Sequence, residues 1–140
     1  MSALPTHCIL FHKQKTSGRL RFLRWPATVV LPALPDGSRL LPGHQAAVLP
    51  HPAAPLAAAA RGLGLAEHEL EASADYLHWL AAGQETTAPL PVILGEFTTI
   101  DPPFAAAEAA GARFIALTEI RDLPAVEQEL LRLAYEHVLG

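Results

Sequence analysis

The residues of this chain that could do chemistry concentrate in the stretch GEFTTIDPPFAAAEAAGARFIALTEI, residues 95–120. Carboxylates and hydroxyls stand there at the ends of two apolar runs. Such oxygens bind cations, and a carboxylate can also accept or donate a proton. We therefore take Glu96, Thr98, Thr118 and Glu119 as candidate ligand-binding residues.

Glu96 is the acid that departs most from its surroundings. Alternate residues of a strand share a face, so Glu96 shares one with Val92, Leu94, Thr98 and Ile100. A carboxylate on such a face lies at a sheet edge or in a pocket. In a pocket it could bind a ligand, act as a general acid/base, or hold a divalent ion together with Asp101 or Glu119.

Asp101 and Asp122 follow the two predicted strands at matching positions, and proline comes soon after each. An aspartate just before a proline in the first helical turn is typical of a helix N-cap. If the two strands formed a parallel pair, both carboxylates would also meet at the carboxyl edge of the sheet, where α/β proteins bind ligands. We favour the cap interpretation.

The N-terminal segment HKQKTSGRLRFLRW carries five cations together with Phe22 and Trp25. Such a mixture is found in proteins that bind single-stranded nucleic acid. Phe22 alternates with Leu20, however, which predicts that both belong to the core. The cations then form a solvated face, pair with acids elsewhere, or bind an anionic molecule, for which Arg21 and Arg24 are the candidates. Nucleic-acid binding is the least favoured of these.

Metal-binding patterns are lacking in the sequence, although it contains seven histidines. His7 and Cys8 point to opposite faces of a strand, and no CxxC, HxxxH or HExxH occurs. We expect no metal site, and no cofactor can be named. Cys8 lies in an apolar run, which predicts a buried and inert thiol.

The elements that must position these residues follow from periodicity and turn signals. Residues 1–31 predict a basic β-hairpin, with its turn at Ser17-Gly18. Residues 32–54 are rich in proline, which predicts an extended loop with one short strand near Leu40.

The second half of the chain predicts helices and two strands. Residues 55–83 indicate a helical hairpin, because Leu70, Ala74, Leu77 and Ala81 recur at helical spacing before Gly83. Residues 90–139 indicate a β-α-β-α unit with a last helix whose apolar face is Val126, Leu130, Leu133, Ala134 and Val138. Together the elements predict one α+β domain over residues 1–140. Its mixed sheet would carry helices on one face and the proline-rich loop along its edge.

Composition limits the protein class. Hydrophobic residues make up 51% and charged residues 17%, which argues against disorder. No run of 18 apolar residues or signal-peptide pattern occurs, and the single cysteine favours the cytoplasm. Residues 1–45 carry about +5 and residues 46–140 about −9, so the basic end is expected to meet acids within the chain, acids of a partner, or an anion.

We predict a homodimer, because the core is rich in alanine and Tyr76 and Trp79 would be exposed on the second helix. The leading functional hypothesis is a non-catalytic, bacterial-type accessory or small-ligand-binding protein with its pocket near Glu96, Thr98 and Glu119. The alternative is a small enzyme acting on an anionic metabolite, with Glu96 as general acid/base and Arg21 or Arg24 holding the anion. A third hypothesis is nucleic-acid binding by the basic hairpin, which predicts affinity that falls steeply with salt.

Overall fold

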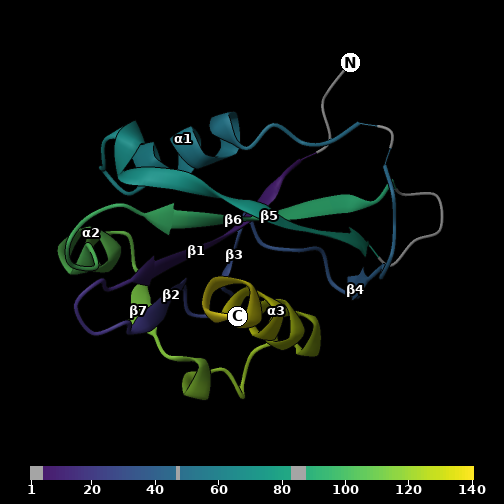
Figure 1. The fold of residues 1–140 in the computed structure, drawn as a ribbon. Helices are drawn as coiled ribbons and strands as arrows, with labels where there is room; N and C mark the ends of the chain where they lie inside the picture. Colours follow the sequence, from purple (N-terminus) through teal and green to yellow (C-terminus); the bar gives the residue numbers. More distant parts are fainter. Residues whose placement is uncertain (1–4, 47, 83–87) are drawn as a thin grey trace.

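A seven-stranded mixed sheet forms the frame of the molecule in the computed structural model, which describes residues 5–46, 48–82 and 88–140 (Figure 1). The strands are β1 (His7–Lys13), β2 (Leu20–Arg24), β3 (Val30–Leu31), β4 (Arg39–Leu40), β5 (Leu70–Ala81), β6 (Leu90–Phe97) and β7 (Arg113–Ile115). Their order is β4-β5-β6-β1-β2-β7, and β3 also pairs with β1. The predicted α+β class with a mixed sheet is confirmed.

The N-terminal hairpin forms as predicted. β1 and β2 pair antiparallel, with Phe11 opposite Phe22 and Lys13 opposite Leu20. Phe11, Leu20 and Phe22 are buried, which confirms the two core positions predicted on β2, and Leu23 and Arg24, which follow them, are buried as well. The predicted short strand near Leu40 is also present, because β4 pairs with β5 at the edge of the sheet.

The one parallel pairing in the described residues joins β1 and β6 rather than the two C-terminal strands. Cys8 lies beside Ile93 and Phe11 beside Glu96. β1 and β2 separate β6 from β7, so the expectation that Asp101 and Asp122 could be neighbours is wrong. β7 is also shorter than predicted, because a 3-10 turn, η2 (Leu117–Glu119), follows it.

The predicted second helix of the helical hairpin is wrong. After the helix α1 (Ala53–Gly62) comes a 3-10 turn, η1 (Glu67–Glu69), and then the long strand β5. β5 pairs along β6 and shifts register between Ala72 and Leu77, where Asp75 has a positive φ of 67°. This bulge interrupts the period-2 pattern that would have revealed a strand. Gly83, the predicted helix stop, lies outside the described residues.

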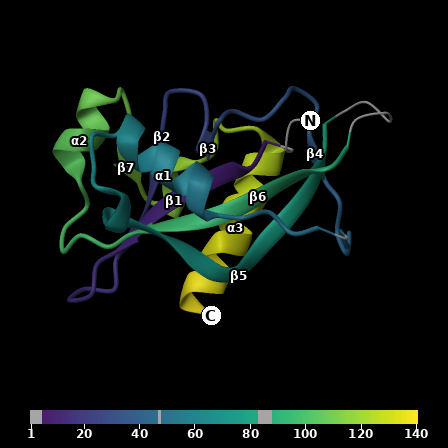
Figure 2. The ribbon, with the colours of Figure 1, turned by 90° about the horizontal axis from the view of Figure 1, so that it is seen from above.

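Helices cover both faces of the sheet, which corrects the expectation of one covered face (Figures 1 and 2). On one face α1 and α2 (Phe104–Ala109) pack over Cys8, Leu10, Leu23 and Ile93. On the other face α3 (Ala125–Leu139) packs over Ile9, Phe22, Tyr76, Val92 and Leu94. The molecule thus has two apolar layers, and alternate residues of β1 and β6 supply both.

The predicted face of α3 is confirmed, and Leu130 and Ala134 are its fully buried members. Tyr76 and Trp79, in contrast, are buried on β5 instead of being exposed on a helix. One argument for a homodimer is thereby removed.

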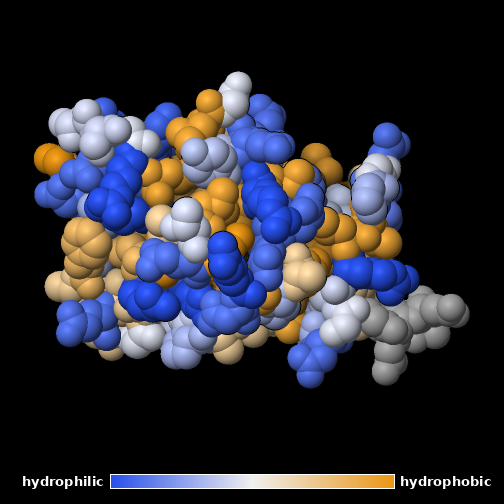
Figure 3. All heavy atoms as spheres, turned by 90° about the horizontal axis from the view of Figure 1, so that it is seen from below, coloured by the Kyte–Doolittle hydropathy of each residue, from blue (hydrophilic) through white to orange (hydrophobic). Residues whose placement is uncertain are grey.

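On the side of α3 and η2, hydrophilic residues are interspersed with hydrophobic ones on the surface (Figure 3).

Candidate functional site

A cavity of about 280 Å³ lies at the carboxyl ends of the parallel strands β1 and β6. Its wall comes from three segments: residues 13–16, which begin with the last residue of β1, residues 96–100 at the end of β6, and Glu71 of β5. Ligands of α/β proteins bind at this end of parallel strands. Glu96 and Thr98 therefore lie at the end of the sheet where a ligand site is expected. The strand that pairs in parallel with β6 is β1, however, and not the second C-terminal strand.

Glu96 faces a second carboxylate across the strand pair. In the antiparallel register of β5 and β6, Glu71 lies directly opposite Glu96. Residues directly opposite each other project to the same face, and like charges in this position repel each other. The pair sits just beyond the buried Leu94, at the end of the apolar layer beneath α3.

Lys13 and Lys15 line the same cavity. Lys13 shares the face of Glu96, because Phe11, two residues before it, lies beside Glu96. In the described part of the chain, none of these lysines and glutamates takes part in an ion pair or a side-chain hydrogen bond. The cavity therefore holds separated charges of both signs.

Hydrogen bonds fix the rim of the cavity. The Thr98 backbone N–H donates to the Glu69 carbonyl at 2.9 Å, and the Thr98 hydroxyl donates to the His68 carbonyl at 2.9 Å. The buried His12 ring donates from Nε2 to the Thr99 carbonyl at 2.8 Å. These bonds hold the segment after β6 in place, so the wall of the cavity is largely preorganised.

Asp101 contacts this rim and does not cap a helix, which corrects the favoured interpretation. Its Oδ1 accepts a hydrogen bond from Gln14 Nε2 at 2.8 Å. α2 begins after Pro103 without a side-chain cap. The bond joins the turn after β1 to the segment after β6.

The other predicted site residues lie elsewhere. Arg21 is opposite His12 and so projects from the other face of the sheet, where its guanidinium stands 5.6 Å from the centre of the Phe104 ring. Thr118 and Glu119 are exposed on η2, where a Glu119 carboxylate oxygen accepts the Ala116 N–H at 2.8 Å. Thr118 and Glu119 are thus not part of the cavity at Glu96.

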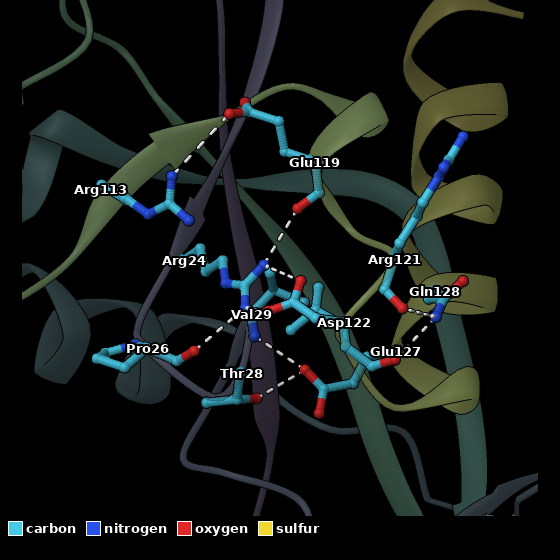
Figure 4. Close-up of polar contacts among 11 residues, drawn as sticks. Arg24, Pro26, Thr28, Val29, Arg113, Glu119, Arg121, Asp122, Glu127 and Gln128 are labelled. Atoms are coloured by element: carbon cyan, nitrogen blue, oxygen red, sulfur yellow. Dashed lines mark hydrogen bonds and ion pairs between the residues drawn. The ribbon is translucent and has the colours of Figure 1, made fainter.

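Arg24 forms the centre of a separate polar network (Figure 4). Its guanidinium is buried, with 4% of the side chain exposed, and binds the Asp122 carboxylate through both terminal nitrogens. It also donates to the carbonyls of Glu119 and Pro26 at 3.1 and 3.2 Å. With its terminal nitrogens engaged in this way, Arg24 is a structural cation and is not available as an anion clamp.

Asp122 is therefore not an N-cap either, because α3 begins after Pro124 without a side-chain cap. Hydrogen bonding to Arg24 lowers the pKa of Asp122 to about 2. The same bond raises the pKa of Arg24. The pair is ionised over the whole physiological range and ties β2 to the segment before α3.

Glu127 is a buried structural carboxylate that the sequence did not lead us to expect. This carboxylate is buried on α3, and one of its oxygens accepts the Thr28 hydroxyl at 2.7 Å and the Val29 N–H at 2.9 Å (Figure 4). It fixes the turn between β2 and β3. A signal existed, because Glu127 shares the helical spacing of the buried Leu130, Leu131 and Ala134.

The part that Lys13, Gln14, Lys15 and Glu71 play in the cavity was also missed. The sequence gives little indication that these residues share a cavity. Glu71, for example, lies near Glu96 only because β5 pairs with β6. Cys8 is buried as predicted, and burial raises the pKa of its thiol to about 12, so the thiol is unreactive at neutral pH.

A second cavity in the described residues is larger and mostly apolar. A groove of about 590 Å³ beside α1 is lined largely by apolar residues, among them Trp25, Leu31, Ala58, Ala59 and Leu63.

No three His, Cys, Asp or Glu side chains within the described ranges lie close enough to share a metal ion. None of the helices in these ranges is both long and apolar enough to cross a membrane.

Neither a protein-family model nor a curated protein matches this chain. A function can therefore be inferred only from the residues of this chain and their arrangement.

Proposed function

We propose that this chain is a non-catalytic protein that binds a small polar ligand in the cavity at the carboxyl ends of β1 and β6. The observation that carries the proposal is that the Glu96 carboxylate is half-buried and has no hydrogen-bond or ion-pair partner among the described residues. Among the acids of the described residues that have neither an ion pair nor a hydrogen bond, Glu96 alone is half-buried; the others are exposed. Removing a carboxylate from water without a partner is unfavourable, and a bound ligand would supply the partner.

The enzyme hypothesis receives less support. It requires an arginine that holds an anionic substrate beside Glu96. Arg21 projects from the opposite face of the sheet, and Arg24 is bound to Asp122. Neither of the two arginines predicted to hold the anion can therefore do so beside Glu96, and the cations that do line the cavity are Lys13 and Lys15. The mixed charges of the cavity suit recognition of a polar ligand.

The proposal is tested by a thermal-shift screen of small polar metabolites on the wild-type protein and on Glu96→Gln. Glu108→Gln serves as the matched control, because Glu108 is exposed on α2 and does not line the cavity. A ligand of the cavity should raise the melting temperature of the wild type and of Glu108→Gln but not of Glu96→Gln. Equal shifts in all three proteins, or no shift with any compound, would contradict the proposal.

A cytoplasmic location and a homodimer both stay predictions. Native mass spectrometry of the purified protein would measure its oligomeric state. Turnover of a compound found in the screen, abolished in Glu96→Gln, would favour the enzyme alternative instead.

A further inference from the structure

We infer that the ligand of this cavity is a small zwitterion, a molecule that carries an ammonium group and an anionic group. The ammonium would lie between Glu71 and Glu96, and the anionic group would face Lys13 and Lys15. This inference rests on the proposed function, because it names the ligand class of the same cavity.

The carboxylate pair defines the cation subsite. Side chains directly opposite in an antiparallel pair have Cβ atoms about 4.5–5.5 Å apart, and Glu71 and Glu96 are opposite each other. An ammonium has three donors and can bond to both carboxylates at once. A divalent metal ion fits less well, because it prefers six or more oxygen ligands and the described residues supply no third acid here.

The lysines define the anion subsite. Lys13 lies on the face of Glu96, two residues beyond the residue that pairs with it, which displaces it by about 6.6 Å along the strand. Lys15 follows in the same wall. The positive side chains thus stand toward the outer end of the cavity, and the negative pair stands nearer the buried layer of the sheet.

Elsewhere in the described residues, the acids without an ion pair or hydrogen bond, such as Asp36 and Glu108, are exposed to water. The buried Glu127 carboxylate, in contrast, accepts hydrogen bonds from Thr28 and Val29. In the cavity, four charged side chains line one space without such a contact. A ligand carrying both charges would neutralise both ends.

The size of the cavity limits the ligand further. A volume of about 280 Å³ lies at the lower end of the range for small-molecule pockets. It suits a molecule of the size of an amino acid. The hydroxyls of Thr98 and Thr99 at the rim already donate to the carbonyls of His68 and Asp101, so toward a ligand they can act only as hydrogen-bond acceptors.

The test uses matched probes on the full chain, followed by two-dimensional amide NMR. The probes are the ω-amino acids from glycine to 6-aminohexanoate, each compared with the amine and the carboxylate of the same carbon skeleton. We expect at least one ω-amino acid to shift the amide signals of residues 13–16 and 96–100. It should bind at least tenfold more tightly than either single-charge analogue.

Variants assign the two ends of the ligand. Glu96→Gln should weaken binding of the ω-amino acid and remove binding of the amine. Lys13→Gln should weaken binding of the ω-amino acid and remove binding of the carboxylate. Glu108→Gln and Arg121→Gln are the controls of matching charge, since both residues are exposed and neither lines the cavity; they should leave binding unchanged.

The outcomes separate this inference from the proposed function. Binding of an amine or a carboxylate as tightly as its ω-amino acid would overturn the zwitterion class and leave the ligand site standing. The same holds if another compound of the thermal-shift screen binds at residues 96–100 while no ω-amino acid does. If no compound perturbs the cavity, both fail, and the lysines serve only as counter-charges for the two glutamates.

Discussion

Buried polar side chains in this protein join segments that are far apart in the chain. Arg24 reaches Asp122, Glu127 reaches Thr28, and the Tyr76 hydroxyl donates to the Leu130 carbonyl at 2.9 Å. Buried polar groups are stable only when they are hydrogen-bonded. Each of these residues is therefore a point at which one substitution tests the architecture.

Asp122→Asn should lower the melting temperature at neutral pH, because it leaves the buried Arg24 guanidinium without its charged partner. The pKa of Asp122 is about 2 in the folded state and 3.8 without its environment, so the carboxylate stabilises the fold above about pH 4. That contribution is lost as the pH falls from about 4 to about 2.

Melting temperature measured against pH checks this prediction, with the exposed Asp36→Asn as the control. The wild type and the control should lose stability in this acid range more steeply than Asp122→Asn. Identical curves for all three proteins would mean that the ion pair contributes nothing to stability.

Tyr76→Phe should reduce the free energy of unfolding by about 1 kcal/mol, the usual net value of one hydrogen bond. The substitution removes the bond to Leu130 and keeps the packing of the ring against α3. Tyr135→Phe is the matched control, because Tyr135 is 40% exposed. Urea unfolding at neutral pH measures both, and an equal effect in the two variants would contradict the assigned role.

At the scale of elements, the contacts between elements decide which secondary structure forms. Residues 65–81 are rich in alanine, leucine and glutamate and repeat apolar residues at helical spacing. They nevertheless form η1 and β5, because β6 offers a free edge along which β5 pairs from Leu70 to Leu80. Intrinsic propensity is a weak preference that such tertiary pairing overrides.

Gly95→Ala should cost about 1–3 kcal/mol, the usual effect of adding a methyl group to a packed core. A Cβ at Gly95 would lie 2.7 Å from Leu56 of α1 and 3.0 Å from Leu10 of β1. The helix packs directly on this glycine, so its side chains would have to move.

Gly62→Ala is the matched control for this prediction, because a Cβ there meets nothing within 4 Å. It lies at the end of α1, where alanine favours the helix, so no loss of stability is expected. Chemical denaturation compares the two variants. Equal stability of Gly95→Ala and the wild type would show that α1 does not press on β6.

The contact between α3 and β5 should be sensitive to pH. His78 and His137 both stand edge-on to the Tyr76 ring, with ring centres 4.7 and 5.7 Å away. The pKa of His78 is lowered below 6.5, mainly by burial of the ring and to a smaller extent by the nearby charge of His137. The folded state therefore favours neutral His78, and stability should fall as the pH drops below about 6.5.

NMR titration of the imidazole signals checks this directly. His137→Gln should raise the pKa of His78, while His51→Gln, at an exposed site, should leave it unchanged. A titration of His78 at or above 6.5 in the wild type would contradict the prediction.

At the scale of the whole molecule, the charge asymmetry of the sequence is met only in part within the chain. Of the ion pairs in the described residues, Arg24–Asp122 alone joins the basic N-terminal part to the acidic remainder; the others are local. Lys13 and Lys15 instead face Glu71 and Glu96 across the cavity.

This arrangement predicts weak binding to polyanions. Glu71, Glu96 and Asp101 lie close to the lysines at the end of the hairpin, and carboxylates repel phosphates. The protein should pass through a heparin column at about 0.15 M salt. Retention that weakens steeply with salt would instead favour nucleic-acid binding by the hairpin.

Several elements were predictable from the sequence, because their signals are local. Alternation along residues 19–22, the helical face of residues 126–138 and the turn at Gly111, with its φ of 76°, depend only on neighbouring residues, and the structure contains all three. Glu96 could be selected as an outlier for the same reason, because its unusual position is visible against its own strand.

Which segments these elements contact could not be predicted from local signals and follows from the packing of the folded chain. β1 rather than β7 became the parallel partner of β6, β5 became a strand, and Glu71 and Lys13 came to Glu96. Asp101 and Asp122 bind Gln14 and Arg24 for the same reason. Pairing and burial depend on groups distant in the chain, and their free energies exceed the local preferences from which sequence patterns are read.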